Sequence, residues 1–276
     1  WGATARGALA TRHTLHALAP LAPRGPAAFD ATVYPLALIA GRAAPTPTHA
    51  VRLGLSHAAE RRAQSCYGAG SWPLGPGAAQ ERLASLAERH GTISEQATLV
   101  LGVKTGCDAA LVLTDTEAAA VDSALLRPAI RGRDVQPFRA TPSRHLLYAY
   151  DAVGRPLATL GADARRHLEP HLGALARRRD LTHGPPWTLF RTGQLRMAHR
   201  VVWADIGLVI RAAVLEAPER DGIALNTCYV AGLSTRSRAQ ALAAWLNAPL
   251  VSALARIGAP PAAGGFARFG PVSYTH

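Results

Sequence analysis

The sequence has few lysines, few cysteines and no long apolar segment. Lys104 is the single lysine among 276 residues. The longest apolar run, residues 33–40, is far shorter than the roughly 20 residues that a membrane-spanning helix needs, so we expect no membrane segment. Cys66, Cys107 and Cys228 stand far apart without a CxxC pair. This spacing disfavours a structural zinc site and a disulfide framework, and it predicts a reducing, cytoplasmic location.

The sequence also lacks the motifs of many cofactor-dependent and hydrolytic enzymes. It contains no GxGxxG or GxxxxGK[ST] loop, no GxSxG nucleophile elbow and no HExxH zinc motif. The string GPPW at 184–187 is similar to the Asn/Asp/Ser-Pro-Pro-aromatic motif of amino-methyltransferases, but Gly184 offers no side-chain acceptor for the amine of a flipped base. We therefore expect no catalytic residue and no metal ligand, and we interpret GPPW as a turn that places Trp187.

Positive charge is what the sequence has in excess. Lys and Arg total 30 against 18 Asp and Glu, which gives a net charge of +12. This balance is typical of a chain that binds a polyanion, and nucleic acid is the leading candidate. A GC-rich coding bias explains the use of Arg in place of Lys, but it does not explain the excess of basic over acidic residues. With 49% hydrophobic and 17% charged residues, the chain is expected to be globular.

The pattern of apolar residues and breakers predicts an α+β fold with mixed or antiparallel strands. In the first part we expect a helical stretch within 1–24, a strand at 26–41 belonging to a hairpin over 28–56, a loop at 65–79 and a helix at 78–90. After residue 92, short strands alternate with two helical segments, 163–179 and 238–258. The predicted domains are 1–60, 61–92 as a linker with a helix, and 93–276.

Arginines gather in two parts of the second half. One group lies within residues 127–144 and another within 165–200. Such groups fit a surface that follows phosphates, although a solvated helix face is the alternative for Arg177–Arg179. Aromatic residues lie between these charges, and they suit either base stacking or the core. We favour the core for Trp187 and Trp203, and we expect Asn247 to end a helix.

Seven motifs in the second half, in this order and spacing, resemble one known family. They are GVKTGCDAALVL (102–113), LLRPAIRGRDV (125–135), the helix ending in LARRR, WTLFR (187–191), VVWADI (201–206), LNTCYV (225–230) and LAAWLNAPL (242–250). Residues 93–276 thereby resemble the TaqI-like specificity (target-recognition) domain of adenine-N6 DNA methyltransferases and fused restriction-modification enzymes. Residues 1–56 resemble the end of the catalytic domain, with FDATVYPLALIAGR as one of its last strands. The cofactor loop and the catalytic motif would then lie upstream of Trp1, so we expect a fragment that does not methylate alone.

The resemblance implies a module that binds duplex DNA, reads a short sequence and presents the target adenine. The catalytic domain would act in cis or in trans, and S-adenosylmethionine would belong to the parent enzyme and not to this chain. Asp134 is an alternative, structural partner for Arg131 or Arg133, and an ordinary hairpin turn is the alternative for GVKTG. The expected DNA contacts are Lys104, Thr105, Arg127, Arg131, Arg133, Arg139, Arg177, Arg178 and Arg191.

Three other functions stay open at this point. The chain could complete an active methyltransferase complex, which predicts methyl transfer when S-adenosylmethionine and duplex DNA are added. It could be the non-catalytic specificity subunit of a multi-subunit restriction system, although such subunits carry two recognition domains and this sequence shows one. A basic structural or RNA-binding protein would bind without regard to duplex sequence.

Overall fold

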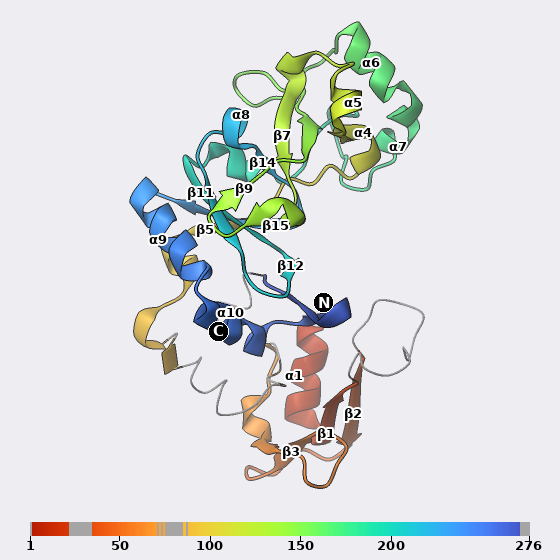
Figure 1. Ribbon diagram of the computed structural model, residues 1–276. Helices are drawn as coiled ribbons and strands as arrows, with labels where there is room; N and C mark the ends of the chain where they lie inside the picture. Colours follow the sequence, from red (N-terminus) through yellow and green to blue (C-terminus); the bar gives the residue numbers. More distant parts are fainter. Residues whose placement is uncertain are drawn as a thin grey trace. The chain divides into compact units, whose positions relative to one another are not determined.

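The computed structural model describes residues 2–21, 35–70, 72, 74, 85, 86 and 88–270, and the chain divides into two compact units (Figure 1). Unit 1 contains the described residues up to Gly91 together with Leu254–Arg268. Unit 2 contains Thr92–Ala253 with Phe269 and Gly270. The functions assigned above to 1–60, 61–92 and 93–276 stay predictions.

Unit 1 is built on a four-stranded sheet against which the first helix packs. In chain order its elements are α1 (Ala3–Arg12), β1 (Thr14–Pro20), β2 (Leu36–Gly41), β3 (Ala50–Leu53), β4 (Arg61–Ala63), η1 (Gln64–Cys66), β16 (Pro261–Ala262), η6 (Ala263–Gly265) and β17 (Phe266–Arg268). The sheet has the order β2-β1-β3-β4, with β1 antiparallel to β2 and parallel to β3. The buried side chain of Gln64 accepts from Leu15 N–H (2.8 Å) and donates to the Ala10 carbonyl oxygen (2.9 Å), which secures the connection from α1 to β1.

One prediction for this unit is confirmed in part and another is wrong. The helical stretch expected within 1–24 forms as α1, but it ends at Arg12 and Thr14–Pro20 forms the inner strand β1. The hairpin expected over 28–56 does not form, because β1 lies between β2 and β3. The alanine-rich segment has a local preference for helix, but as a strand it buries Leu15 and Leu18 between β2 and β3. This burial outweighs the helix preference and also keeps β2 and β3 apart. Much of the expected strand at 26–41 and of the helix at 78–90 lies outside the described residues.

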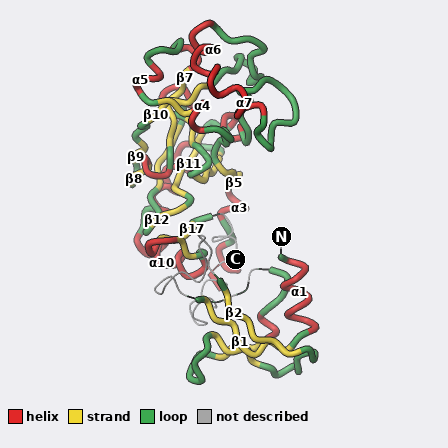
Figure 2. Tube along the Cα trace, turned by 90° about the vertical axis from the view of Figure 1, so that its right-hand side faces the viewer, coloured by secondary structure: helices red, strands yellow, loops and turns green. Residues whose placement is uncertain are grey.

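Unit 2 contains two further four-stranded sheets and most of the helices (Figures 1 and 2). In chain order its elements are α3 (Ile93–Gln96), β5 (Thr98–Leu101), α4 (Asp108–Leu111), β6 (Val112–Leu113), α5 (Asp115–Ala118), η2 (Ser123–Leu125), β7 (Leu126–Ile130), η3 (Gly132–Asp134), β8 (Val135–Gln136), β9 (Arg139–Ala140), β10 (Arg144–Leu147), α6 (Ala162–Leu168), η4 (Glu169–His171), α7 (Leu172–Ala176), η5 (Thr192–Arg196), β11 (His199–Ala204), β12 (Ile206–Gly207), β13 (Ala212–Leu215), α8 (Pro218–Asp221), β14 (Ile223–Ala224), β15 (Cys228–Leu233), α9 (Arg236–Leu246) and α10 (Pro249–Gly258). The division between the units falls inside α10.

The first sheet of unit 2 carries the larger core. It has the order β14-β7-β10-β6, and helices α4–α7 cover one face of it (Figure 1). Leu111 of α4, Leu168 of α6 and Leu175 of α7 belong to one buried cluster with Leu146 and Leu147 of β10. The loops between these helices and strands carry the candidate binding residues, so this core positions the site.

The second sheet has the order β13-β11-β15-β5, and α9 packs on β11 and β13. Trp203 of β11 is fully buried and its indole N–H donates to the Phe269 carbonyl oxygen at 2.9 Å, as expected for a core residue. Asn247 ends α9, and its side-chain amide pairs with both the N–H and the carbonyl oxygen of Ala212 at 2.9 Å. The expectation that Asn247 terminates a helix is therefore confirmed.

The observed mixture of helices with mixed and antiparallel sheets confirms the α+β prediction. The two long helical segments are interrupted, however. The segment at 163–179 becomes α6, η4 and α7, with Pro170 at the first turn of η4, and the segment at 238–258 becomes α9 and α10, which meet at 73°. Among the described residues no single helix is long and apolar enough to cross a membrane, although the bent pair of α9 and α10 has the necessary length and composition together.

Candidate nucleic-acid interface

The GVKTG segment is a tightly held loop and not a hairpin turn. It leaves β5 at Gly102, whose N–H donates to the Cys228 carbonyl oxygen at 2.9 Å. Val103 N–H donates to the Ala224 carbonyl oxygen at 2.8 Å. Lys104 N–H donates to the Phe190 carbonyl oxygen at 3.0 Å, and Phe190 N–H donates back to that of Lys104 at 2.9 Å. The loop therefore presents the Lys104 side chain from a fixed backbone.

Lys104 belongs to a cluster of charges drawn from three separate segments. Its ammonium group makes an ion pair with Asp180, and this hydrogen bond holds the pKa of the Asp180 carboxyl below its ordinary value. The positive charges of Arg191 and Arg179 lower the same pKa further. We call these four residues the Asp180 cluster. The charges of three cations therefore act on a single carboxylate, so the cluster carries a net positive charge.

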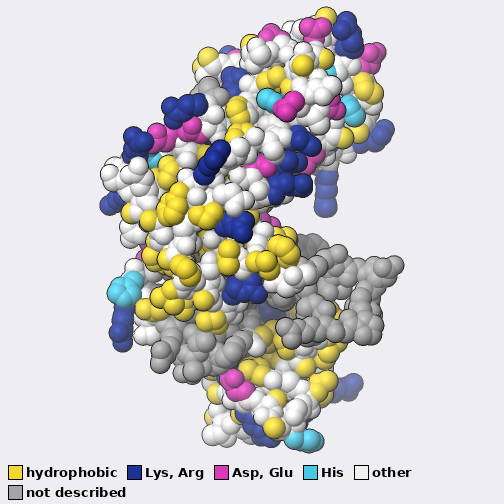
Figure 3. Space-filling view, in the orientation of Figure 1, with side chains coloured by type: hydrophobic (Ala, Val, Ile, Leu, Met, Phe, Trp, Pro, Cys, Tyr) yellow, Lys and Arg dark blue, Asp and Glu magenta, His cyan; other side chains and the backbone are white. Residues whose placement is uncertain are grey.

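The two arginines of this cluster, and Arg177 beside them in the sequence, are at the surface. Arg177 and Arg179 follow the end of α7 and are exposed, and Arg191 is exposed at the start of η5. Within the described part of the chain these three arginines make no side-chain hydrogen bond. Arg191 has a left-handed backbone with φ of 58°, which is uncommon for a residue other than glycine. Figure 3 shows Lys and Arg side chains gathered on this face of unit 2, near α4 and α7.

Arg178 and Thr105, both expected to contact DNA, lie in the interior. The guanidinium of Arg178 donates to the main-chain oxygens of Thr105, Leu175 (3.0 Å) and Pro186 (2.6 Å), and it lies 4.7 Å from the centre of the Phe190 ring. The Thr105 hydroxyl donates to Asp108. Both side chains are buried and present no surface contact. Arg178 holds the loop to the end of α7, and Thr105 ties the loop to Asp108 of α4.

The arginines that follow β7 form a second group with different surroundings. Asp134 is buried and accepts from the Arg131 N–H (2.8 Å) and from Ser143 Oγ (2.5 Å), and its carboxylate lies 3.5 Å from Arg131 Nε. Of the two arginines considered as partners for Asp134, the structure pairs Arg131. Arg133 and Arg139 are exposed and make no side-chain hydrogen bond or ion pair within the described residues.

Arg127 stands apart from both groups. Its guanidinium lies 5.4 Å from the centre of the Tyr148 ring, and Nη1 donates to the carbonyl oxygens of Ala124 (3.0 Å) and Leu126 (2.7 Å). It lines a pocket of about 490 Å³ together with Tyr148 and Arg196. The structure therefore distributes the expected contact residues over the Asp180 cluster with Arg177, the group after β7, this pocket and the interior.

Two features of this region were not expected from the sequence, and a third was. Asp180, which pairs with Lys104, is the last residue of the RRRD string at 177–180, and its place beside the arginines is the signal that could have identified it. Arg200, counted among the basic residues at 165–200, is fully buried and donates to the Gly222 carbonyl oxygen at 3.3 Å. Trp187 packs against the core of the first sheet and its indole N–H donates to Leu157 at 3.0 Å, in agreement with its expected structural role.

Two observations in the described part of the chain bear on a bound metal ion or S-adenosylmethionine. Among them, no three His, Cys, Asp or Glu side chains lie close enough together to hold a metal ion. The glycine-rich turn between β5 and α4 has its Gly102, Val103 and Lys104 N–H groups bonded within the protein, and α4 is only 4 residues long. The N–H groups of Gly102, Val103 and Lys104 are therefore not available to a ligand.

Comparison with known proteins finds similarity among solved structures. No family profile matches the sequence, and no curated protein matches it. A solved structure with a similar arrangement is that of the type IIL restriction-modification enzyme MmeI in complex with DNA, at 13% sequence identity and a TM-score of 0.49. The match covers 96% of this chain but 34% of that one, so this chain spans about a third of the length of MmeI.

Proposed function

We propose that this chain binds duplex DNA through unit 2 and selects a short sequence. It would be the specificity part of an adenine-N6 DNA methyltransferase of the restriction-modification type. The observation that carries the proposal is the Asp180 cluster, in which Lys104, Arg179 and Arg191 come together from three segments of the chain.

The physical basis is a local excess of positive charge that is accessible and only weakly neutralised. The side chains of Lys104 and Asp180 are 34% and 41% exposed to solvent, and an ion pair this exposed contributes little to stability. A phosphate can therefore take the place of the carboxylate at Lys104 at small cost. Bidentate guanidinium groups suit phosphate oxygens and the edge of guanine, which allows the exposed arginines both to position and to read a duplex.

Thr105 and Arg178 act in this proposal as positioning residues. They fix the GVKTG loop against the end of α7, so that Lys104 and Arg179 keep a constant separation. Arg133 and Arg139 would extend the contact beyond the Asp180 cluster, while Arg131 is held by Asp134 and orients that segment. A rigid arrangement of charges favours one register on the duplex over others.

Methyl transfer is assigned to a catalytic domain in cis or in trans, which would bind S-adenosylmethionine and act on the presented adenine in the cytoplasm. The two alternatives of the same class are a non-catalytic specificity subunit and a chain that completes an active complex.

The test is selection from a pool of duplexes with a randomised central segment, at physiological salt and with competing RNA. Enrichment of a short common sequence is the expected result. Equal retention of all duplexes, or preferential retention of RNA, would instead indicate a general polyanion-binding protein. Methyl transfer by the purified chain alone would contradict the assignment of catalysis to another domain.

A further inference from the structure

We propose that the pocket beside Arg127 binds one nucleotide unit, with the base inside and its phosphate at the rim. The inference deepens the proposed function, since it supplies a place for a single nucleotide next to the surface that grips the strand. The same chemistry would also admit a free mononucleotide. The pocket lies wholly within unit 2.

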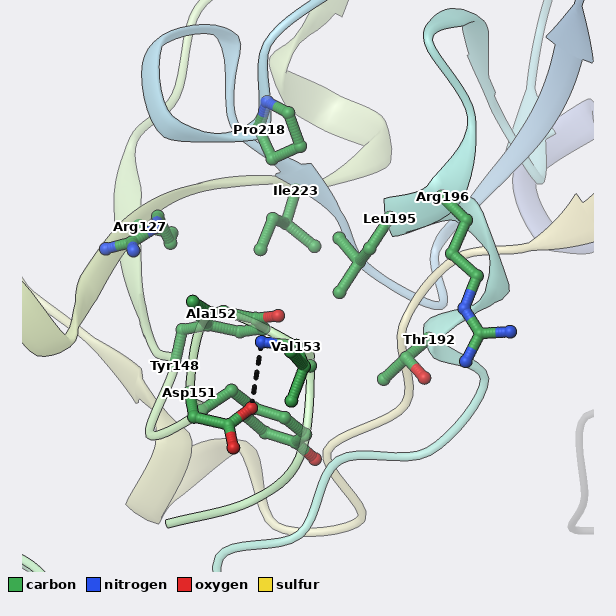
Figure 4. A pocket seen from close by; sticks show the side chains of 12 residues that line it. Arg127, Tyr148, Asp151, Ala152, Val153, Thr192, Leu195, Arg196, Pro218 and Ile223 are labelled. Atoms are coloured by element: carbon green, nitrogen blue, oxygen red, sulfur yellow. Dashed lines mark hydrogen bonds between the residues drawn. The ribbon is translucent and has the colours of Figure 1, made fainter.

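The size and lining of the pocket suit a planar, partly apolar group. Its volume of about 490 Å³ falls in the range of roughly 300–1,000 Å³ found for small-molecule sites. Leu195, Pro218 and Ile223 form one wall, and the turn that contains Asp151 and Val153 forms the facing one (Figure 4). A base could therefore lie between an apolar wall and a polar turn.

A stack of planar groups borders the pocket. The rings of Tyr148 and Tyr150 are stacked, with centroids 4.7 Å apart and an angle of 15° between their planes. The Arg127 guanidinium lies over Tyr148 and is fixed by its bonds to the Ala124 and Leu126 carbonyl oxygens. Bases stack on guanidinium planes as well as on aromatic rings, so an ordered arginine at the end of an aromatic stack is a surface for a base.

The charge available in the pocket is positive. Asp151 is occupied by its own turn, because its carboxylate accepts from the main-chain N–H groups of Val153 (3.0 Å) and Arg155 (2.8 Å) and from Arg155 Nε (2.9 Å). Arg196 is exposed and makes no side-chain hydrogen bond or ion pair in the described part of the protein. Arg127 and Arg196 stand at opposite sides of the pocket, which places a cation at each rim for a phosphate (Figure 4).

A short helix connects this pocket with the Asp180 cluster. Arg191 directly precedes η5 and Arg196 ends it. A 3₁₀ helix rises about 2 Å per residue, so these two arginines are roughly 10 Å apart along the axis, which is within reach of neighbouring nucleotides of one strand. A strand held at Arg191 would therefore bring an adjacent nucleotide to the pocket.

The experiment compares four probes by equilibrium binding to the full chain. They are a fully paired duplex, the same duplex with a single-nucleotide bulge, the same bulge without its base, and free deoxynucleoside monophosphates. Two variants alter the pocket: Arg196→Ala removes a rim cation at an exposed position, and Leu195→Trp fills the cavity. Arg238→Ala removes an exposed arginine of α9 and serves as the control for charge.

We expect the bulged duplex to bind about tenfold more tightly than the base-free bulge, as stacking of one base provides. Both pocket variants should reduce this preference and Arg238→Ala should not. A second outcome is that free mononucleotides bind, that the pocket variants abolish this binding, and that the bulged duplex is not preferred. This outcome would assign the pocket to a free nucleotide and not to a nucleotide of the strand. If neither probe responds to the variants, the inference is wrong. Because the paired duplex is measured in the same series, its failure to bind would count against the proposed function and not against the pocket.

Discussion

Arg178 reaches back 73 residues along the chain to donate to the main-chain carbonyl oxygen of Thr105, and both side chains are buried. The same guanidinium also donates to Leu175 and Pro186. One arginine thus ties together the GVKTG loop, the end of α7 and the segment before Trp187. Gly106 makes room for it, since a Cβ there would lie 2.9 Å from Arg178 Cδ and the backbone has φ of +68°.

Arg178→Met should therefore destabilise unit 2 while Arg177→Ala should not. Methionine keeps much of the apolar volume but leaves the carbonyl oxygens of Thr105 and Pro186 without their donor, which costs on the order of 3 kcal/mol in the free energy of unfolding. Arg177 is exposed, and its replacement should change stability by less than about 0.5 kcal/mol. Urea unfolding followed by circular dichroism measures both. Equal midpoints for the two variants would show that Arg178 does not hold these segments.

The salt dependence of DNA binding tests the Asp180 cluster. We expect Arg179→Ala combined with Arg191→Asn to lower the slope of log K against log salt by about 1.8, which is about 0.9 for each lost phosphate contact. Asparagine is chosen at Arg191 because it tolerates the left-handed backbone there. Arg238→Ala is the matched control, and filter binding between 50 and 200 mM salt would be the measurement. An unchanged slope in the double variant would remove the cluster from the interface.

Replacing Arg131 should affect mainly folding and replacing Arg133 should affect mainly DNA binding, although the two arginines are close in the sequence. Arg131→Ala removes the cation beside buried Asp134 and should lower the free energy of unfolding by about 1–3 kcal/mol. Arg133→Ala should leave stability unchanged and reduce duplex affinity together with the salt slope. Thermal unfolding and DNA titration of each variant give the two quantities. The opposite pattern would exchange the roles assigned to the two arginines.

The carboxylate of Asp221 makes the free energy of unfolding of unit 2 depend on pH. The Arg220 guanidinium and the N–H groups of Glu216 and Ala217 lower the pKa of Asp221 from 3.8 to about 2. Because the pKa is lower in the folded state, this stability is fully present above pH 4 and is lost as the pH falls toward 2. Asp221→Asn should therefore cost about 1–2 kcal/mol at pH 7, and the difference from the wild type should shrink between pH 4 and pH 2. Urea unfolding at a series of pH values would show a constant difference if Asp221 were not the group responsible.

Local patterns were sufficient for the α+β class, for Asn247 at the end of α9 and for Trp203 in the core, because burial and capping are properties of short segments. They failed at Thr14–Pro20, whose strand is formed by neighbours from elsewhere in the chain. They also could not separate Arg178 from Arg177 and Arg179. All three arginines share one sequence context, and only the contacts with Thr105 and Pro186 show which of them points inward.

Gly102 tests whether the fixed position of the GVKTG loop matters for both folding and binding. A Cβ at this residue would lie 2.0 Å from the Leu225 carbonyl oxygen and 2.7 Å from that of Ala224, so alanine would push the loop away from the segment between β14 and β15. We expect Gly102→Ala to lower the free energy of unfolding by about 3 kcal/mol or more and to weaken DNA binding in the fraction that still folds, because Lys104 moves with the loop. Gly193→Ala is the matched control, since a Cβ there meets nothing within 4 Å. If Gly102→Ala unfolds at the same urea concentration as Gly193→Ala, the close approach of Gly102 to Leu225 does not constrain the loop, and the positioning argument for Lys104 fails with it.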